Sequence, residues 1–246
     1  MKDADWLYSV HVAHRGLYGN GVIENTIEAF ELAVEKGYNV ELDVQLTKDG
    51  QLVVFHDENI KRMMGVDINV RDLTYDELNR IRFIASDTAR VPLFSEVCEL
   101  CEGKVGIMIE VKKEEHNELD HDVEDALIAM LENYDNLDYI VKSFNPFAVD
   151  YFREKLPSAR RGFLSYRNSI SEYKDYQQPM VERLLFDETR HVDFFDYQAQ
   201  RVHSELFDEV FGSMPIILWT VTSQEEYEKV RDVADNIIFE RFIPRD

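Results

Sequence analysis

Hydrophobic residues gather in short runs, and segments with the spacing of amphipathic helices lie between them. Eight runs have the length and the β-branched and aromatic content of strands: residues 10–14, 39–44, 105–111, 139–144, 160–166, 192–197, 216–221 and 236–240. Nearly all are separated by enough chain for a helix, which predicts parallel strands joined by right-handed crossovers. Eight strands linked in this way predict a closed (β/α)8 barrel, the TIM-barrel fold of the α/β class. No linker or repeat interrupts the pattern, so we expect residues 1–246 to form a single domain.

Helix boundary signals support this reading. Asn25 stands three residues before Glu28, which is the spacing of a capping box, and Gly37 stands where a helix starting there would end. Thr74 and Glu77 repeat the capping-box spacing further along the chain. The predicted helices therefore begin and end between the predicted strands.

One strand pair departs from the strand–helix rhythm. Residues 51–56 form another strand candidate, only a short turn after the second strand. No crossover helix fits there, so the sequence predicts a β-hairpin excursion after the second strand, turning at Asp49-Gly50. A two-residue loop places Asp43 opposite His56, whereas a bulged turn shifts the register by one residue. In both cases His56 returns to the end of the second strand.

Composition narrows the classes of function. The chain is 45% hydrophobic and carries a formal charge of −22, which suits a soluble globular protein and disfavours binding to nucleic acid or to anionic membranes. The N-terminal sequence lacks the apolar segment of a signal peptide, and no run approaches the length of a membrane span. We therefore expect a cytoplasmic protein without stable membrane association. Cys98 and Cys101 fall on the apolar stripe of a short helix and are expected to be core residues.

Polar residues that can carry chemistry fall at the ends of the first three predicted barrel strands. Glu41 and Asp43 project from one face of the second strand, Glu110 lies near the end of the third, and His14 ends the first. The hairpin brings His56 to the same place. Active sites of these barrels lie at the C-terminal ends of the strands. Three neighbouring carboxylates repel one another unless a cation lies among them, and all-oxygen ligation points to Mg²⁺, Ca²⁺ or Mn²⁺.

Each of these signals has an ordinary explanation when taken alone. An E-x-D pair is more often a solvated strand face, Arg15 and Lys112 can pair with nearby acids, and Asn25 can simply start a helix. What indicates a site is the placement of all of them at one end of the predicted barrel.

The same residues lie in a recognisable series of motifs. They are AHRG (13–16), ENT (24–26), ELDVQLTKDG (41–50), VVFHD (53–57), IEVK (109–112), SF (143–144) and WTV (219–221). In order and approximate spacing this series resembles the glycerophosphodiester phosphodiesterase family, from about residue 10 to residue 240. The resemblance is most specific in residues 13–57 and in IEVK.

The resemblance implies a metal centre with acid–base catalysis. Glu41, Asp43 and Glu110 match the family's ligands for one divalent cation, and His14 and His56 match its acid–base pair. A bound cation would coordinate a phosphate oxygen and withdraw negative charge from it. One histidine would remove a proton from the nucleophile, and the other would protonate the leaving alkoxide. Attack by water and attack through a cyclic phosphate both remain open.

Other matched positions surround that centre. Arg15 and Lys112 match basic groups near the phosphate, Glu24 and Asn25 match residues that line or brace the site, and Trp219 matches a wall of the substrate pocket. The small-molecule substrate implied is a phosphodiester.

The chain also departs from the family pattern. Val22-Ile23-Glu24 stands where a proline usually precedes ENT, Thr222 replaces an asparagine, and Phe239-Glu240-Arg241 replaces a T-D turn. The sequence also has no room for the usual closing helix. We expect the N-terminal segment around Trp6 and Leu7, or a second subunit of a homo-oligomer, to cover the flank left open.

We therefore expect metal-dependent hydrolysis of a glycerophosphodiester to glycerol 3-phosphate and an alcohol. One alternative keeps the fold and changes the substrate, as in a lysophospholipase D-like or sphingomyelinase D-like enzyme. Two others are a non-catalytic barrel that binds phosphodiesters and a barrel that uses two carboxylates on sugars.

Overall fold

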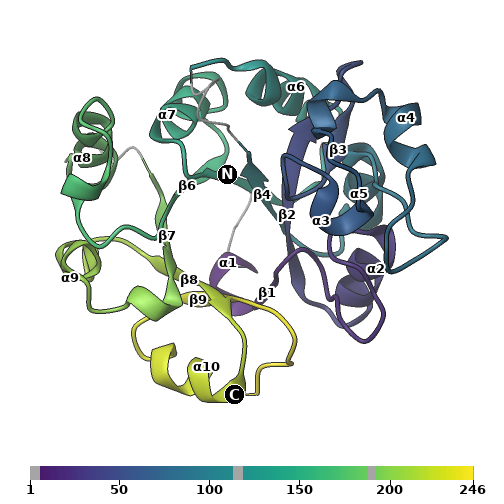
Figure 1. Cartoon of the computed structure of the whole chain (residues 1–246). Coiled ribbons are helices and arrows are strands. Elements are labelled where there is room, and N and C mark those ends of the chain that lie inside the picture. The colour runs from purple at the N-terminus through teal and green to yellow at the C-terminus, as the bar shows by residue number, and fades with distance from the viewer. Residues whose placement is uncertain (1–5, 113–118, 188–191, 246) are drawn as a thin grey trace.

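The computed structural model describes residues 6–112, 119–187 and 192–245. It contains a closed barrel of eight parallel strands surrounded by helices (Figure 1). The strands are β1 (Val12–Ala13), β2 (Asn39–Leu46), β4 (Ile107–Val111), β5 (Tyr139–Ser143), β6 (Arg160–Ser165), β7 (Phe194–Gln198), β8 (Ile216–Val221) and β9 (Asn236–Phe239), with β3 (Leu52–Val54) added outside. The barrel closes because β1 pairs with both β2 and β9, which confirms the predicted fold.

Helices connect most of the strands, and α1 precedes β1. They are α1 (Trp6–Ser9), α2 (Ile27–Glu35), α3 (Lys61–Met64), α4 (Tyr75–Arg80), α5 (Phe94–Cys101), α6 (Asp122–Leu131), α7 (Pro146–Lys155), α8 (Gln178–Phe186), α9 (Glu205–Val210) and α10 (Gln224–Val230). Short 3₁₀ turns are η1 (Val70–Asp72), η3 (Ile170–Glu172) and η4 (Ala199–Arg201). Within the described ranges, no helix combines the length and apolarity that crossing a bilayer requires. Cys98 and Cys101 are fully buried on α5, as predicted.

The start of α2 differs from the prediction. The N-cap is Thr26, whose hydroxyl accepts a hydrogen bond from the backbone N–H of Ala29, and Asn25 is not part of the cap. Asn25 instead has a φ of 55° and lies in the turn before the cap, which frees its side chain for another contact. The other signals are confirmed, since Thr74 forms a capping box with its glutamate and Gly37 has a φ of 73° after the helix end.

The hairpin adopts the bulged form of the two registers considered. Val44 pairs with Val54, which places Asp43 opposite Phe55, and the backbone N–H of Phe55 donates to Asp43 O at 3.0 Å. The direct pairing of Asp43 with His56 is therefore wrong by one residue. The reason is a three-residue turn in which Gly50 has a φ of 75°, a conformation that glycine adopts without strain.

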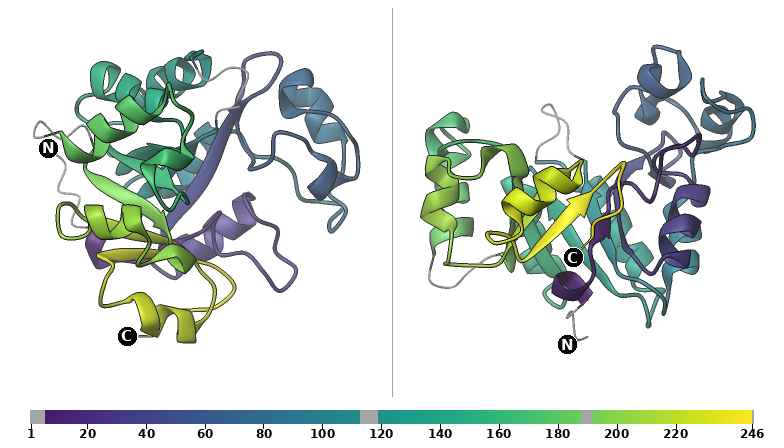
Figure 2. Two further views of the ribbon diagram at one scale, coloured as in Figure 1. Left: turned by 60° about the vertical axis from the view of Figure 1, so that its left-hand side comes forward. Right: turned by 90° about the horizontal axis from the view of Figure 1, so that it is seen from below.

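A small lobe follows the hairpin and stands beside the open end of the barrel (Figure 2). It contains α3, η1 and α4 and has its own apolar cluster. The largest buried members are Phe55, Ile60, Leu78 and Phe83. This lobe holds the strand end that carries His56.

The N-terminal helix α1 closes the opposite mouth of the barrel. Leu7 is fully buried in the interior cluster, and the ring of Trp6 lies so close to Gly106 that a Cβ there would approach it to 2.5 Å. The side chains of Asn39 and Asn236, at the starts of β2 and β9, donate to carbonyl oxygens of this segment. The expectation that Trp6 and Leu7 cover an outer flank is therefore wrong. These residues instead fill the apolar end of the barrel interior.

Candidate active site

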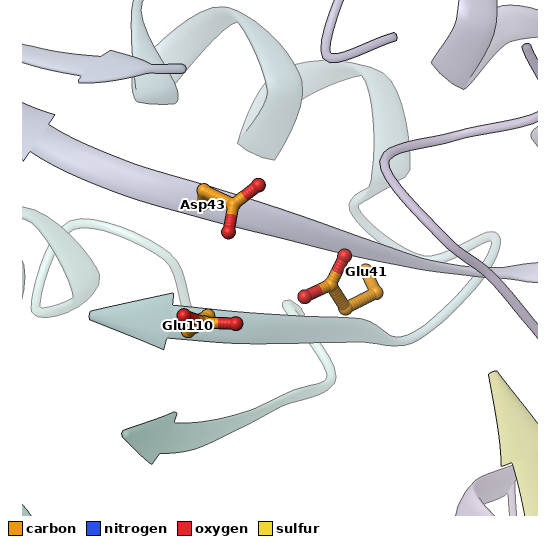
Figure 3. A group of neighbouring side chains, drawn as sticks. All are labelled: Glu41, Asp43 and Glu110. Atoms are coloured by element: carbon orange, nitrogen blue, oxygen red, sulfur yellow. The ribbon is translucent and has the colours of Figure 1, made fainter. Parts of the chain in front are cut away.

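Three buried carboxylates meet inside the C-terminal end of the barrel. Glu41 and Asp43 come from β2 and Glu110 from β4, and their side chains turn toward one another (Figure 3). The pairing of Asp43 with Glu110 across the two strands sets them side by side. One oxygen from each lies within 4.8 Å of the others, and exposure is 1%, 1% and 5% respectively. The structure thus brings together the three residues that the sequence grouped as ligands.

Three cations offset this negative charge. Lys112 bonds to Glu110 and lies 2.9 Å from Asp43, while Arg15 Nε lies 3.5 Å from the other oxygen of Asp43. Although burial opposes ionisation, Lys112, His56 and Arg15 hold the pKa of Asp43 far below its usual range. Asp43 is therefore ionised and able to act as a ligand.

The third cation, Lys142, was not predicted to belong to the site. It lies on β5 with 2% exposure, and its ammonium is 3.2 Å from Glu41 and 2.9 Å from Asp196 on β7. Burial raises the pKa of Asp196 to about 6, against the opposing effect of Lys142. A lysine and an aspartate inside predicted barrel strands were the available signal, because charges there need a partner across the barrel.

His14 faces the carboxylate cluster and is held from the last strand. Its Nε2 lies 4.0 Å from Glu41, and its Nδ1 lies 2.7 Å from an oxygen of Glu240, just after β9. The hydroxyl of Tyr18 donates to the same oxygen. Burial alone would raise the pKa of Glu240, but the hydrogen bonds from His14 and Tyr18 bring it down to about 2.

His56 is held in a similar way by a neighbour in the chain. Its Nδ1 lies 2.6 Å from Asp57, and Arg62 of α3 donates two hydrogen bonds to the same carboxylate. Arg62 also donates to Glu24, which accepts a 2.6 Å hydrogen bond from Arg15. These contacts link the hairpin to the turn after β1. Sequence reasoning did not include Arg62, which sits in a lobe whose position the sequence did not specify.

A strained turn after β1 positions Arg15. Arg15 has a φ of 55° and Gly16 a φ of 79°, and a Cβ on Gly16 would lie 2.8 Å from Ala29. The backbone N–H of Asn25 donates to Arg15 O, and its side-chain amide donates to Asp43 at 2.9 Å. Glycine is required where the turn presses on α2, and Asn25 braces Asp43 directly.

Trp219 lies on the opposite side of the barrel from these carboxylates. Its ring packs on the interior apolar cluster and meets Phe144 edge-to-face with ring centres 5.4 Å apart. Its indole N–H donates to the backbone of Asp196 at 3.3 Å. Thr222, three residues after Trp219, donates hydrogen bonds from its backbone N–H and its hydroxyl to Glu226 on α10.

The donor set fits a hard divalent cation. The candidate ligands are all carboxylate oxygens, and nitrogen or sulfur ligands for a softer metal are lacking among the described residues of this cluster. In the same part of the chain, the buried Oδ1 of Asn25 finds no hydrogen-bond donor. An unpaired oxygen on the residue that braces Asp43 is consistent with a site built for a bound ligand.

Comparison with known proteins agrees with this geometry. Residues 14–238 match the glycerophosphoryl diester phosphodiesterase family. A glycerophosphodiester phosphodiesterase of Caldanaerobacter subterraneus is 36% identical over 160 residues, which are 62% of this chain and 65% of that protein.

Solved structures give the same result over nearly the whole chain. The glycerophosphodiester phosphodiesterase of Thermotoga maritima is 32% identical, with a TM-score of 0.72 and coverage of 94% of each chain. An Oleispira antarctica phosphodiesterase, solved with its product sn-glycerol-3-phosphate, shares the fold at 20% identity, with a TM-score of 0.79 and coverage of 96% of this chain and 94% of that one. This chain belongs to the glycerophosphoryl diester phosphodiesterase family, and it is a phosphoric diester hydrolase.

Proposed function

We propose that this protein hydrolyses water-soluble glycerophosphodiesters to glycerol 3-phosphate and an alcohol, with one divalent cation. The observation that carries the proposal is the buried cluster of Glu41, Asp43 and Glu110. His14 faces this cluster through Nε2, and its Nδ1 is held by the carboxylate of Glu240. The product bound to the Oleispira antarctica relative supports the same substrate class.

Glu41, Asp43 and Glu110 would hold Mg²⁺, Ca²⁺ or Mn²⁺. The bound ion would supply Lewis-acid polarisation of a phosphoryl oxygen. In the described structure Asp43 is held ionised by its cationic neighbours, while Glu110 pairs with Lys112 and Glu41 pairs with Lys142.

The surrounding side chains would bind the phosphodiester and move protons. Arg15 and Lys112 stabilise negative charge on the phosphoryl oxygens, since charge-assisted hydrogen bonds are stronger than neutral ones. His14 and His56 exchange protons with the nucleophile and the leaving alkoxide, each through the ring nitrogen that is not bound to a carboxylate.

Bracing and shape come from three further residues. Glu24 fixes Arg15 and Asn25 fixes Asp43. Trp219 forms an apolar wall opposite the carboxylates.

The direct test is release of glycerol 3-phosphate from glycerophosphocholine and glycerophosphoethanolamine. The protein is assayed with EDTA and then with each of the three ions restored, and lysophosphatidylcholine serves as the competing substrate. We expect activity only with a restored ion and a preference for the water-soluble diesters. A preference for the lysolipid would replace this proposal with the lysophospholipase D-like alternative.

Two histidine variants, one in the site and one on the surface, test the catalytic role of His14. His14→Ala should lower kcat by about a thousandfold, because general acid–base catalysis contributes ~10²–10⁴-fold. His203→Asn is the matched variant, since His203 is 75% exposed with a φ of 71°, which asparagine tolerates. Full activity of His14→Ala would refute acid–base catalysis by this residue.

A further inference from the structure

Glu240 reaches a histidine of the active site from the far end of the chain. Parallel pairing of β1 with β9 sets Ala13 opposite Phe239, so the next residues, His14 and Glu240, leave the barrel at the same level. Their side chains meet with His14 Nδ1 2.7 Å from Glu240 Oε2. In the sequence this glutamate was only a departure from the family's last-strand pattern.

Further contacts fix the glutamate and the histidine in place. The Tyr18 hydroxyl donates to the same oxygen of Glu240, and the Glu240 backbone N–H donates to Val221 O at 3.0 Å. The His14 backbone N–H donates to Phe239 O at 2.9 Å. The side chains of His14 and Glu240 are only 13% and 11% exposed, so water competes little for the bond between them.

An ionised carboxylate can only accept hydrogen bonds, so the His14 nitrogen that faces Glu240 must carry the proton. In the neutral ring the lone pair then lies on Nε2, the nitrogen on the side of Glu41. We infer that Glu240 is a positioning residue, which holds His14 as the Nδ1–H tautomer and directs Nε2 to the reacting phosphodiester. This inference rests on the proposed hydrolysis.

The consequence for the reaction follows from proton balance. When the nucleophile attacks, its O–H bond breaks and an N–H bond forms at His14 Nε2, which leaves an imidazolium beside the Glu240 carboxylate. When His14 acts as the acid instead, the Nε2 proton passes to the leaving alkoxide and the neutral Nδ1–H ring is restored. In both directions Glu240 keeps Nδ1 protonated, so that Nε2 is the nitrogen that exchanges the proton, and it stabilises the charged ring without touching substrate.

Two substitutions separate the hydrogen bond from the charge. Glu240→Leu removes the acceptor and the charge at similar volume, whereas Glu240→Gln keeps an acceptor oxygen and removes only the charge. We expect kcat to fall about a hundredfold in Glu240→Leu and about tenfold in Glu240→Gln, because second-layer partners of reacting groups are typically worth ~10–100-fold. The KM should stay within about twofold in both, since the residue does not contact substrate.

A control variant covers the general effect of changing a glutamate. Glu225→Gln alters an 80% exposed residue that pairs only with Lys229 among the described residues, and it should leave kcat and KM unchanged. Thermal unfolding of each variant identifies any that is simply unfolded. Glu240→Gln, which preserves size and hydrogen bonding, keeps the test open if the leucine variant does not fold.

A measurement that needs no activity reports on the tautomer directly. The ¹⁵N chemical shifts of histidine side chains distinguish protonated from bare ring nitrogens, and the His14 signals are those lost in His14→Ala. At pH 8.5, above the ordinary histidine pKa of about 6.5, we expect pure Nδ1–H tautomer in the wild type and a mixture in Glu240→Leu. Absence of diesterase activity in the wild type would overturn the proposed function and leave the tautomer to decide this inference. The inference that Glu240 positions His14 is overturned if Glu240→Leu shows an unchanged tautomer. It is also overturned if the kcat of Glu240→Leu stays within about twofold of wild type.

Discussion

Replacing Lys142 by methionine should leave two buried carboxylates without their counter-ion. The substitution preserves chain length and removes the ammonium that lies 3.2 Å from Glu41 and 2.9 Å from Asp196. Glu41 and Asp196 are both at most 1% exposed, so water cannot replace the ammonium as their hydrogen-bond partner. Breaking a buried ion pair from one side costs about 3–5 kcal/mol, because the remaining charge stays desolvated.

The cost should depend on pH in a direction that the structure fixes. Burial raises the pKa of Asp196 to about 6, so the folded protein binds this proton more tightly than the unfolded chain, whose aspartates titrate near 4. The contribution of Asp196 to stability is therefore greatest at low pH and falls as pH rises from about 4 to about 6. Without Lys142 the pKa of Asp196 should rise further, and the penalty should be larger at pH 8 than at pH 5.

Urea unfolding in EDTA at both pH values measures this penalty without a contribution from bound metal. At pH 8 we expect a loss of about 4 kcal/mol, which corresponds to a melting temperature lower by roughly 12 °C for a chain of this size. Lys229→Met is the matched control, because Lys229 is 68% exposed and surface pairs contribute about 0–1 kcal/mol. Adding Asp196→Asn to Lys142→Met should recover part of the loss. A penalty below about 1 kcal/mol, or no recovery in the double variant, would refute the reasoning.

Further predictions concern the metal, the histidine network and the thiols. Glu110→Gln should weaken binding of the divalent cation at least about tenfold in calorimetry, since one of three carboxylate ligands is lost; unchanged affinity would remove Glu110 from the ligand set. Arg62→Met should lower kcat about tenfold by freeing Asp57, the carboxylate that holds His56, and steady-state kinetics against Lys61→Met as control would detect it. Cys98 and Cys101 should be inert to a thiol reagent at pH 8 until urea is added, because burial raises the pKa of Cys101 to about 12 and that of Cys98 further; rapid labelling of the folded protein would contradict this.

Much of the site could be predicted because its residues lie toward the C-terminal end of the barrel. Glu41, Asp43 and Glu110 follow the two-residue alternation of β2 and β4, and in a parallel barrel all strand ends meet on one side. Local geometry was enough to group them. The hairpin brought His56 near the same strand end, although the exact register needed the conformation at Gly50.

The partners of these residues were harder to predict. Glu240 lies 226 positions from His14, and Lys142 lies 54 positions from Asp196. Hydrogen bonds between such distant residues depend on which strands are neighbours and at what level they end. Asn25 shows the same limit at short range. The sequence indicated the start of a helix at this place, but the residue that caps the helix is Thr26.

The strand–helix alternation, the closed barrel and the carboxylate cluster could be predicted from residue order, because periodicity and the order of charged residues along a strand are local properties of the chain. The groups that hold the cluster and its histidines in place could be identified only in the folded protein. Closure of β1 against β9 brings Glu240 to His14, and the β5 to β7 span brings Lys142 to Asp196. It also placed α1 in the barrel mouth, where an apolar interior had to be filled. Those contacts arise from strand neighbourhood and packing, which residue order specifies only through the complete fold.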